Sequence, residues 1–172
     1  MKICLNAGHT VNGAGYGAVG LLKESEETRK VVSAVKRYLE MKEHTVIIAN
    51  VDSAKTQSMY LYQVAKKANE SDAELFVSIH FNSGGGRGCE AYTWRGKETS
   101  AAVGVCDELQ KIGFNNRGVK DGSGLYVIGA TKMNALLVEV CFVDSRLDVD
   151  LYKKHGVNVI AQAITRGILK QL

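Results

Sequence analysis

The chain has 172 residues, of which 45% are hydrophobic and 23% are charged, and its formal net charge is +4. This length and composition are typical of one globular domain with a two-sided core, so residues 1–172 are expected to form a single domain. No apolar run approaches the roughly 20 residues that a membrane-spanning helix needs, which argues against membrane insertion. The modest charge, without a run of Lys and Arg among aromatic residues, argues against a nucleic-acid-binding face.

The hydrophobic pattern alternates between short apolar runs and longer segments with helical spacing. In chain order it predicts strand 2–7, helix 24–42, strand 45–49, helix 57–69, strands 74–80 and 88–94, helix 98–112, strands 124–129 and 134–142, and helix 156–171. The Gly-rich stretches 84–88 and 116–124 are predicted to be loops at the rim of a site. The alternation predicts an α/β fold: a twisted, mostly parallel sheet with helices on both faces.

Two of the four His residues come at the ends of predicted strands, His9 after 2–7 and His80 at the end of 74–80. An α/β domain binds ligands outside the carboxyl ends of its parallel strands, so two imidazoles placed there suggest a shared metal. Taken singly, each His is better explained as a hydrogen-bonded core or loop residue, but the pair favours metal ligands. His44 and His155 lack this context.

A carboxylate is needed to complete such a site, because zinc in hydrolases is commonly held by two His and one carboxylate, with water in the fourth position. Glu24 is the strongest choice, since the Gly-rich loop after His9 is long enough to return the chain to the strand ends. The alternative is that Glu24, Glu26 and Glu27 are first-turn acids that suit the helix dipole. Spacing alone leaves both interpretations open.

Glu139 interrupts the apolar strand 134–142, where a carboxylate is costly unless it has a partner or lies at the strand end. Beside zinc, it is suited to take a proton from the attacking water and give it to a leaving amine. The alternative is a buried salt bridge or a surface acid at the strand end. Asn82 shares strand parity with His80, which suggests that it orients a ligand or the substrate; alternatively it is a turn residue.

The cysteines include no pair with the C-x-x-C spacing of zinc knuckles and thioredoxin motifs. They are Cys4, Cys89, Cys106 and Cys141. We expect them to be small buried hydrophobic residues that stay reduced.

These residues together resemble a known family. The markers are Asn6-Ala7-Gly8-His9, Glu24, Ser78-Ile79-His80-Phe81-Asn82 and Leu137-Val138-Glu139-Val140. In order, spacing and context they are similar to those of zinc-dependent N-acetylmuramoyl-L-alanine amidases of the amidase-3 type, over essentially the whole chain. The chain looks especially like the catalytic domains of clostridial phage endolysins and clostridial autolysins.

The resemblance implies that His9, Glu24 and His80 bind Zn²⁺. It also implies that Glu139 is the catalytic glutamate and that the substrate is peptidoglycan, cut at the amide between N-acetylmuramic acid and L-alanine. The chain departs from the family in having Asn6 in place of Asp and Thr10 in place of Gly, and in the residues after Glu139. None of these departures removes a proposed ligand.

Three other functions are alternatives to this one. They are a zinc peptidase that cuts stem peptides or crossbridges, a non-catalytic wall-binding module with the same fold, and a nucleotide-binding α/β domain. The last lacks a phosphate-binding glycine pattern after a strand.

The N-terminus begins directly with a predicted strand, so no secretory signal peptide is expected. A phage endolysin of this kind accumulates in the host cytoplasm and reaches the cell wall through a membrane lesion. A C-terminal wall-binding module in a longer parent protein is a further expectation.

Overall fold

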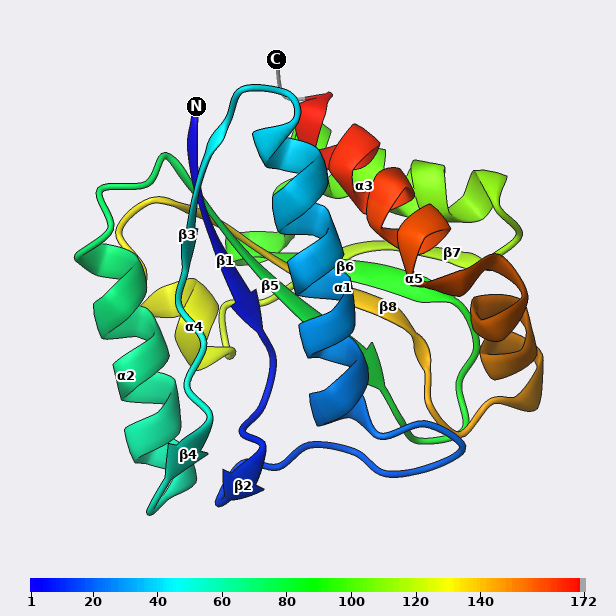
Figure 1. The fold of residues 1–172 in the computed structure, drawn as a ribbon, viewed down its shortest axis with the longest axis horizontal. Helices are drawn as coiled ribbons and strands as arrows, with labels where there is room; N and C mark the ends of the chain where they lie inside the picture. The colour runs from blue at the N-terminus through cyan, green and yellow to red at the C-terminus, as the bar shows by residue number, and fades with distance from the viewer. Residues whose placement is uncertain (171–172) are drawn as a thin grey trace.

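The computed structural model describes residues 1–170 (Figure 1). Its main sheet contains the strands β1 (Lys2–Ala7), β3 (Thr45–Ile48), β5 (Leu75–Asn82), β6 (Cys89–Thr93), β7 (Asn116–Asp121) and β8 (Asn134–Phe142). The helices are α1 (Glu24–Glu40), α2 (Gln57–Asn69), α3 (Ser100–Lys111), α4 (Tyr126–Gly129) and α5 (Arg146–Leu169). The short strands β2 (Asn12–Gly13) and β4 (Ser53–Ala54) pair with each other, and one 3-10 turn covers Trp94–Gly96.

The strand order of the main sheet is β3-β1-β5-β8-β6-β7. Its neighbouring strands run parallel except for β6 and β8, which are antiparallel. The predicted mostly parallel sheet is therefore confirmed. Because β1, β5 and β8 are parallel neighbours, their carboxyl ends meet at one edge, and His80 is in register with Glu139 there.

Helices cover both faces of the sheet, as predicted. One face packs against α1, α3 and α5 through residues such as Ile3 of β1 and Val77 of β5. The other packs against α2 and α4 through residues such as Cys4 and Phe76, as the alternation of side chains along a strand requires. In Figure 1, α1 and α5 lie near each other, and α2 lies apart from these two helices at the left of the molecule. All four cysteines are buried and free, in agreement with the sequence.

Two predicted elements around 116–129 are wrong. Residues 116–124 were expected to form a loop, but β7 occupies Asn116–Asp121 at the edge of the sheet. Its polar side chains and Gly118, which has a positive φ, hide the strand pattern. Residues 124–129 were expected to form a strand, but Tyr126–Gly129 is the helix α4. A short apolar run does not distinguish a strand from a buried helical turn by periodicity.

The closing helix is longer than predicted. It begins at Arg146, where the Ser145 side chain caps it by accepting the N–H of Asp148. Gly156, with φ 73° and ψ 162°, breaks it into two helical pieces, and the apolar periodicity reveals only the second. The predicted end at residue 171 lies outside the described residues.

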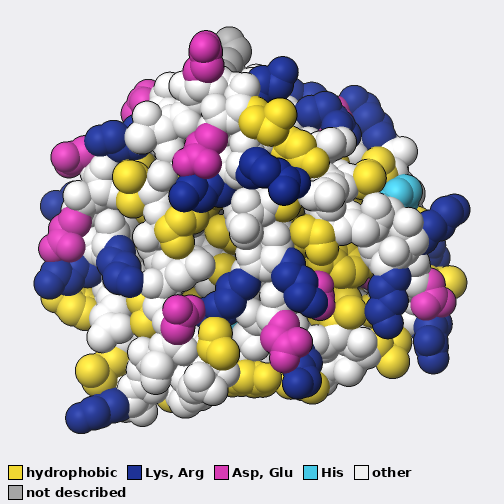
Figure 2. Space-filling model, in the orientation of Figure 1, with side chains coloured by type: hydrophobic (Ala, Val, Ile, Leu, Met, Phe, Trp, Pro, Cys, Tyr) yellow, Lys and Arg dark blue, Asp and Glu magenta, His cyan; other side chains and the backbone are white. Residues whose placement is uncertain are grey.

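The surface is mixed in charge. On the face in Figure 2, Lys and Arg side chains are interspersed with Asp and Glu rather than gathered in one continuous patch. Within residues 1–170, no helix combines the length and the apolar character that crossing a bilayer requires.

Candidate metal centre

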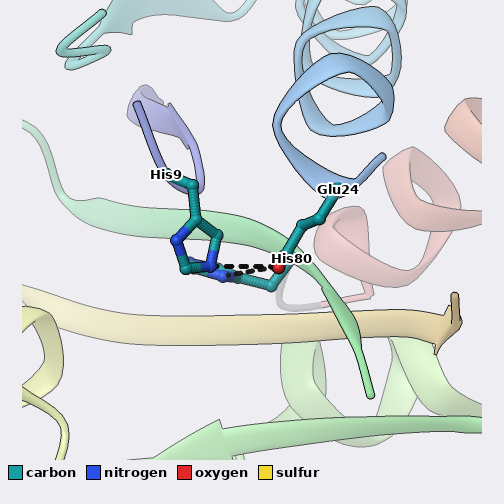
Figure 3. Close-up of side chains that lie close together, drawn as sticks. All are labelled: His9, Glu24 and His80. Carbon is teal, nitrogen blue, oxygen red and sulfur yellow. Dashed lines mark hydrogen bonds and ion pairs between the residues drawn. The ribbon is translucent and has the colours of Figure 1, made fainter. Parts of the chain in front are cut away.

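The structure brings the three predicted metal ligands together at the carboxyl edge of the sheet (Figure 3). His9 follows β1, His80 lies in β5 and Glu24 is the first residue of α1. The Oε1 atom of Glu24 lies 3.1 Å from His9 Nε2 and 3.1 Å from His80 Nδ1. Two ligands held tetrahedrally by one zinc ion lie about 3.3 Å apart, so the observed spacing suits that ion.

Glu24, rather than its acidic neighbours, occupies this position. Glu26 pairs with Lys23, and Glu27 bonds to Lys30 and Tyr152. Both Glu24 oxygens accept backbone N–H groups, Oε1 from Phe81 at 3.0 Å and Oε2 from Ala18 at 2.9 Å. The sequence alone left the choice of carboxylate open. In the structure, the Gly-rich loop after His9 folds back and places Glu24 beside the two imidazoles.

The backbone at the end of β1 is shaped around the two imidazoles. His9 has a φ of +68°, in the left-handed region that non-Gly residues seldom occupy and that clusters at functional sites. A Cβ on Gly8 would lie 2.4 Å from Cε1 of His80, so only glycine leaves room for that ring. A Cβ on Gly17 would lie 2.7 Å from Cγ of His9. The glycines therefore permit the close approach of the proposed ligands.

Hydrogen bonds on the far side of each ring set its tautomer. His9 Nδ1 lies 2.9 Å from the carbonyl oxygen of Gly15, to which it donates. His80 Nε2 lies 3.1 Å from Ser78 Oγ, whose own hydrogen is donated to Asn6 Oδ1 at 2.8 Å. His80 Nε2 is thus the donor to Ser78. Each neutral ring then turns an unprotonated nitrogen toward Glu24, which is the orientation of metal-ligating histidines.

Three lone-pair-bearing atoms therefore converge on one point, and a cation is the natural partner for them. Their donor set, two imidazole nitrogens and a carboxylate oxygen, is one that zinc prefers. The side chain of Asn6, which accepts from Ser78 behind His80, is itself held in place because its Nδ2 donates to the Ala49 carbonyl at 3.1 Å. The departure from Asp at this position thus preserves an acceptor for Ser78.

The ionisation of the three groups is coupled. Burial alone would raise the pKa of Glu24, but His80 and His9, which donate hydrogen bonds to it when their rings are protonated, hold that pKa well below its usual range. Burial alone would lower the pKa of His9, but the hydrogen bond and charge of Glu24 raise it. For His80, burial outweighs Glu24 and lowers the pKa. Glu24 is therefore a carboxylate at neutral pH, as a metal ligand must be.

Glu139 lies next to this centre, in register with His80 on the neighbouring strand. Both residues line one cavity of about 480 Å³, together with His9, Asn82 and Tyr92. Burial, followed by the negative charges of Glu24 and Glu90, raises the pKa of Glu139 well above its usual value.

The Oε2 atom of Glu139 is sealed from solvent and has no hydrogen-bond partner among the described residues. No salt bridge to Glu139 is found among the described residues, so the alternative of a buried ion pair is not supported. A carboxyl group left without a partner in a cavity is a candidate for proton transfer.

The sequence did not reveal Glu90 or Tyr92 as part of this region. Glu90 of β6 is in register with Glu139 and accepts hydrogen bonds from Asn82 and Tyr92. Both were within the predicted strand 88–94, and Glu90 shares strand parity with Tyr92. This parity places the two side chains on the same face of the sheet, and it is the only sequence feature that could have predicted their contact.

Fold and site together define an α/β domain whose strand ends carry a candidate His–Glu–His metal centre beside a carboxyl group with one buried oxygen that no described residue hydrogen-bonds, the arrangement of a metal-dependent hydrolase. Residues 3–170 match the model of the family Amidase_3, N-acetylmuramoyl-L-alanine amidase, and the chain belongs to this family. Family members are generally zinc-dependent.

Relatives and solved structures agree with this assignment. An uncharacterised protein of Clostridium perfringens is 37% identical over 98% of this chain and 51% of its own length. The endolysin of Bacillus phage SPP1 is 32% identical over 99% of this chain and 65% of its own length. The catalytic domain of CD27L, an endolysin targeting Clostridia difficile, superposes with a TM-score of 0.91 at 27% identity, covering 98% of this chain and 97% of that domain.

The chain spans about half the length of the Clostridium perfringens relatives that it matches.

Proposed function

We propose that this chain hydrolyses the amide bond between N-acetylmuramic acid and L-alanine in peptidoglycan, in the bacterial cell wall. Membership of the amidase family supports the reaction and the substrate. The observation that carries the proposal for this chain is the Glu139 carboxyl group, whose buried Oε2 has no partner among the described residues, in the cavity lined by His9 and His80, which converge with Glu24.

The metal in this proposal is zinc, held by His9 Nε2, Glu24 Oε1 and His80 Nδ1. When bound, zinc supplies a Lewis acid for the scissile carbonyl and lowers the pKa of water toward about 7. The chain's own contribution is to fix the three ligand atoms before the ion arrives. The backbone N–H groups on Glu24 and the acceptors Gly15 and Ser78 behind the imidazoles do this.

Glu139 is the proposed catalytic residue. It takes a proton from the attacking water, whose oxygen bonds to the lactyl carbonyl carbon. It then gives the proton to the L-alanine nitrogen as the carbon–nitrogen bond breaks, leaving a carboxylic acid and a free amine. Burial and the negative charges of Glu24 and Glu90 raise the pKa of Glu139, which suits the second step, in which it delivers a proton. A cation bound at Glu24 would offset that negative charge and favour the carboxylate that the first step needs.

Mass spectrometry of digested cell walls tests the bond that is cut. The proposal predicts intact stem peptides with a new L-alanine amino terminus and intact glycan strands. Shortened stem peptides would identify a zinc peptidase instead. Sedimentation with walls, without zinc binding or new amines, would identify a non-catalytic wall-binding module.

The larger size of the relatives is compatible with a longer parent protein. The wall-binding module after this domain, and accumulation in the host cytoplasm before release, stay predictions.

A further inference from the structure

A polar cluster beside the cavity is not used by the proposed mechanism. It is centred on Glu90, only 2% exposed, and we call it the Glu90 cluster. The side chains around Glu90 come from β5, β6 and β7 and are Asn82, Tyr92, Arg117 and Lys120. A buried carboxylate with four partners is a costly arrangement that calls for a role.

The two oxygens of Glu90 divide these partners by charge. Oε2 accepts from Arg117 Nε at 2.6 Å and from Lys120 Nζ at 2.5 Å. Oε1 accepts from Asn82 Nδ2 at 2.8 Å and from the Tyr92 hydroxyl at 2.7 Å. Burial alone would raise the pKa of Glu90, but the hydrogen bonds from Lys120, Arg117 and Tyr92 lower it. Glu90 is therefore ionised and acts only as an acceptor.

Because Glu90 only accepts, each of its partners must donate a hydrogen to it, and that hydrogen is no longer available to a bound molecule. The single hydroxyl hydrogen of Tyr92 is given to Glu90, so Tyr92 Oη has only lone pairs to offer another molecule. Burial and the bond to Glu90 raise the pKa of Tyr92, which keeps that hydrogen in place.

The amide of Asn82 is fixed from both sides. Nδ2 donates to Glu90, and Oδ1 accepts the Ser83 N–H at 2.8 Å. Asn82 keeps one N–H to offer another molecule.

Asn82 and Tyr92 both line the cavity that holds His80 and Glu139. One residue of an extended peptide presents its backbone N–H donor and its carbonyl acceptor on the same side, the complement of what Tyr92 and Asn82 offer. We propose that Glu90 is a positioning residue that presents Tyr92 as an acceptor and Asn82 as a donor to the backbone N–H and carbonyl of one residue of the bound stem peptide. This inference rests on the proposed amidase function, because that function supplies a peptide at the site.

The test measures binding without turnover. The protein is zinc-loaded Glu139→Gln, the probe is N-acetylmuramoyl-tripeptide, and the readout is Kd by calorimetry. Adding Glu90→Gln, which gives Tyr92 and Asn82 a neighbour that also donates, is expected to raise Kd about tenfold. Glu108→Gln is the matched control, because Glu108 is another buried carboxylate paired with cations, which are Lys111, Arg166 and Lys170, on the helical face. It is expected to leave Kd unchanged.

Tyr92→Phe provides a second variant that leaves the ion pairs of Glu90 in place. It is expected to raise Kd by a similar factor, and the double variant with Glu90→Gln is expected to bind no more weakly than the weaker single variant. The inference is overturned if Tyr92→Phe binds like its parent, if the two effects multiply, or if Glu108→Gln weakens binding as much as Glu90→Gln. Failure of the amidase proposal is seen separately, as absence of hydrolysis of the same probe by the chain with Glu139 intact.

Discussion

Glu108 on α3 is buried and Glu139 on β8 is half-buried with one sealed carboxyl oxygen, and the two carboxyl groups have opposite surroundings. Glu108 is 5% exposed and bonds to Lys111 and Arg166, and these hydrogen bonds lower its pKa to about 2. Glu139 has an oxygen with no partner among the described residues, and burial raises its pKa. The paired carboxylate ties α3 to α5, whereas the unpaired one lies in the cavity, where it is available for chemistry.

Replacing Glu139 should have the largest effect. Glu139→Gln removes the proton carrier, so wall lysis is expected to fall by about 10²–10⁴-fold while bound zinc and the melting temperature are retained. Glu108→Gln should do the reverse, with normal lysis and a loss of about 1 kcal/mol of stability. Turbidity assays on wall suspensions, zinc analysis and thermal melts check both variants. Normal lysis by Glu139→Gln would contradict the assignment.

Removing a proposed ligand should abolish metal and activity together. His80→Ala takes one of three ligands from the centre, so both zinc content and lysis are expected to be lost. His44→Ala is the control, because His44 lies outside the centre, next to the N-terminus. Zinc analysis after gel filtration separates the two outcomes. Full zinc content in His80→Ala would remove that residue from the ligand set.

A smaller change can disturb the centre without touching a ligand. In Gly8→Ala the new Cβ would lie 2.4 Å from the His80 ring, so the ring must shift. Zinc affinity is expected to fall at least tenfold, as when the support of a metal ligand is altered. In Gly129→Ala the nearest atom is 3.4 Å away, an ordinary contact, so this control should bind zinc normally. Equal affinities in a competition titration with a chelator would refute the crowding argument.

The smallest expected effect is the pH dependence that Glu108 confers. Its pKa is about 2 in the folded chain, below its ordinary value of 4.5. The folded state therefore binds this proton less readily, so the stabilisation is complete above pH 4.5 and is lost as the pH falls toward 2. The stability difference between the unsubstituted chain and Glu108→Gln should narrow over that window in denaturant titrations. A constant difference would show that Glu108 stabilises by packing alone.

The sequence predicted the parts of this account that depend on strand order and strand ends. His9 follows β1 and His80 lies near the end of β5, and parallel neighbours bring such ends together, so their meeting was foreseeable. Glu24 required the loop before α1 to fold back, which spacing permits but does not determine. The Glu90 cluster was not foreseeable, because its partners come from three strands and their contacts exist only after the sheet has formed.

The errors have the same origin. The edge strand β7 is polar because one side of it has no neighbouring strand, so it resembles a loop in sequence. The first part of α5 is held by Ser145 and by the buried Asp148, which accepts the N–H groups of Gly88 and Phe142. These are polar interactions that an apolar periodicity does not detect.

Zinc titration into chelator-treated protein, with wall lysis followed at each addition, tests the central claim most directly. The account predicts no lysis without the metal and a rise that saturates at one equivalent of zinc per chain. Lysis that persists in metal-free protein, or saturation with no zinc bound at His9, Glu24 and His80, would contradict it.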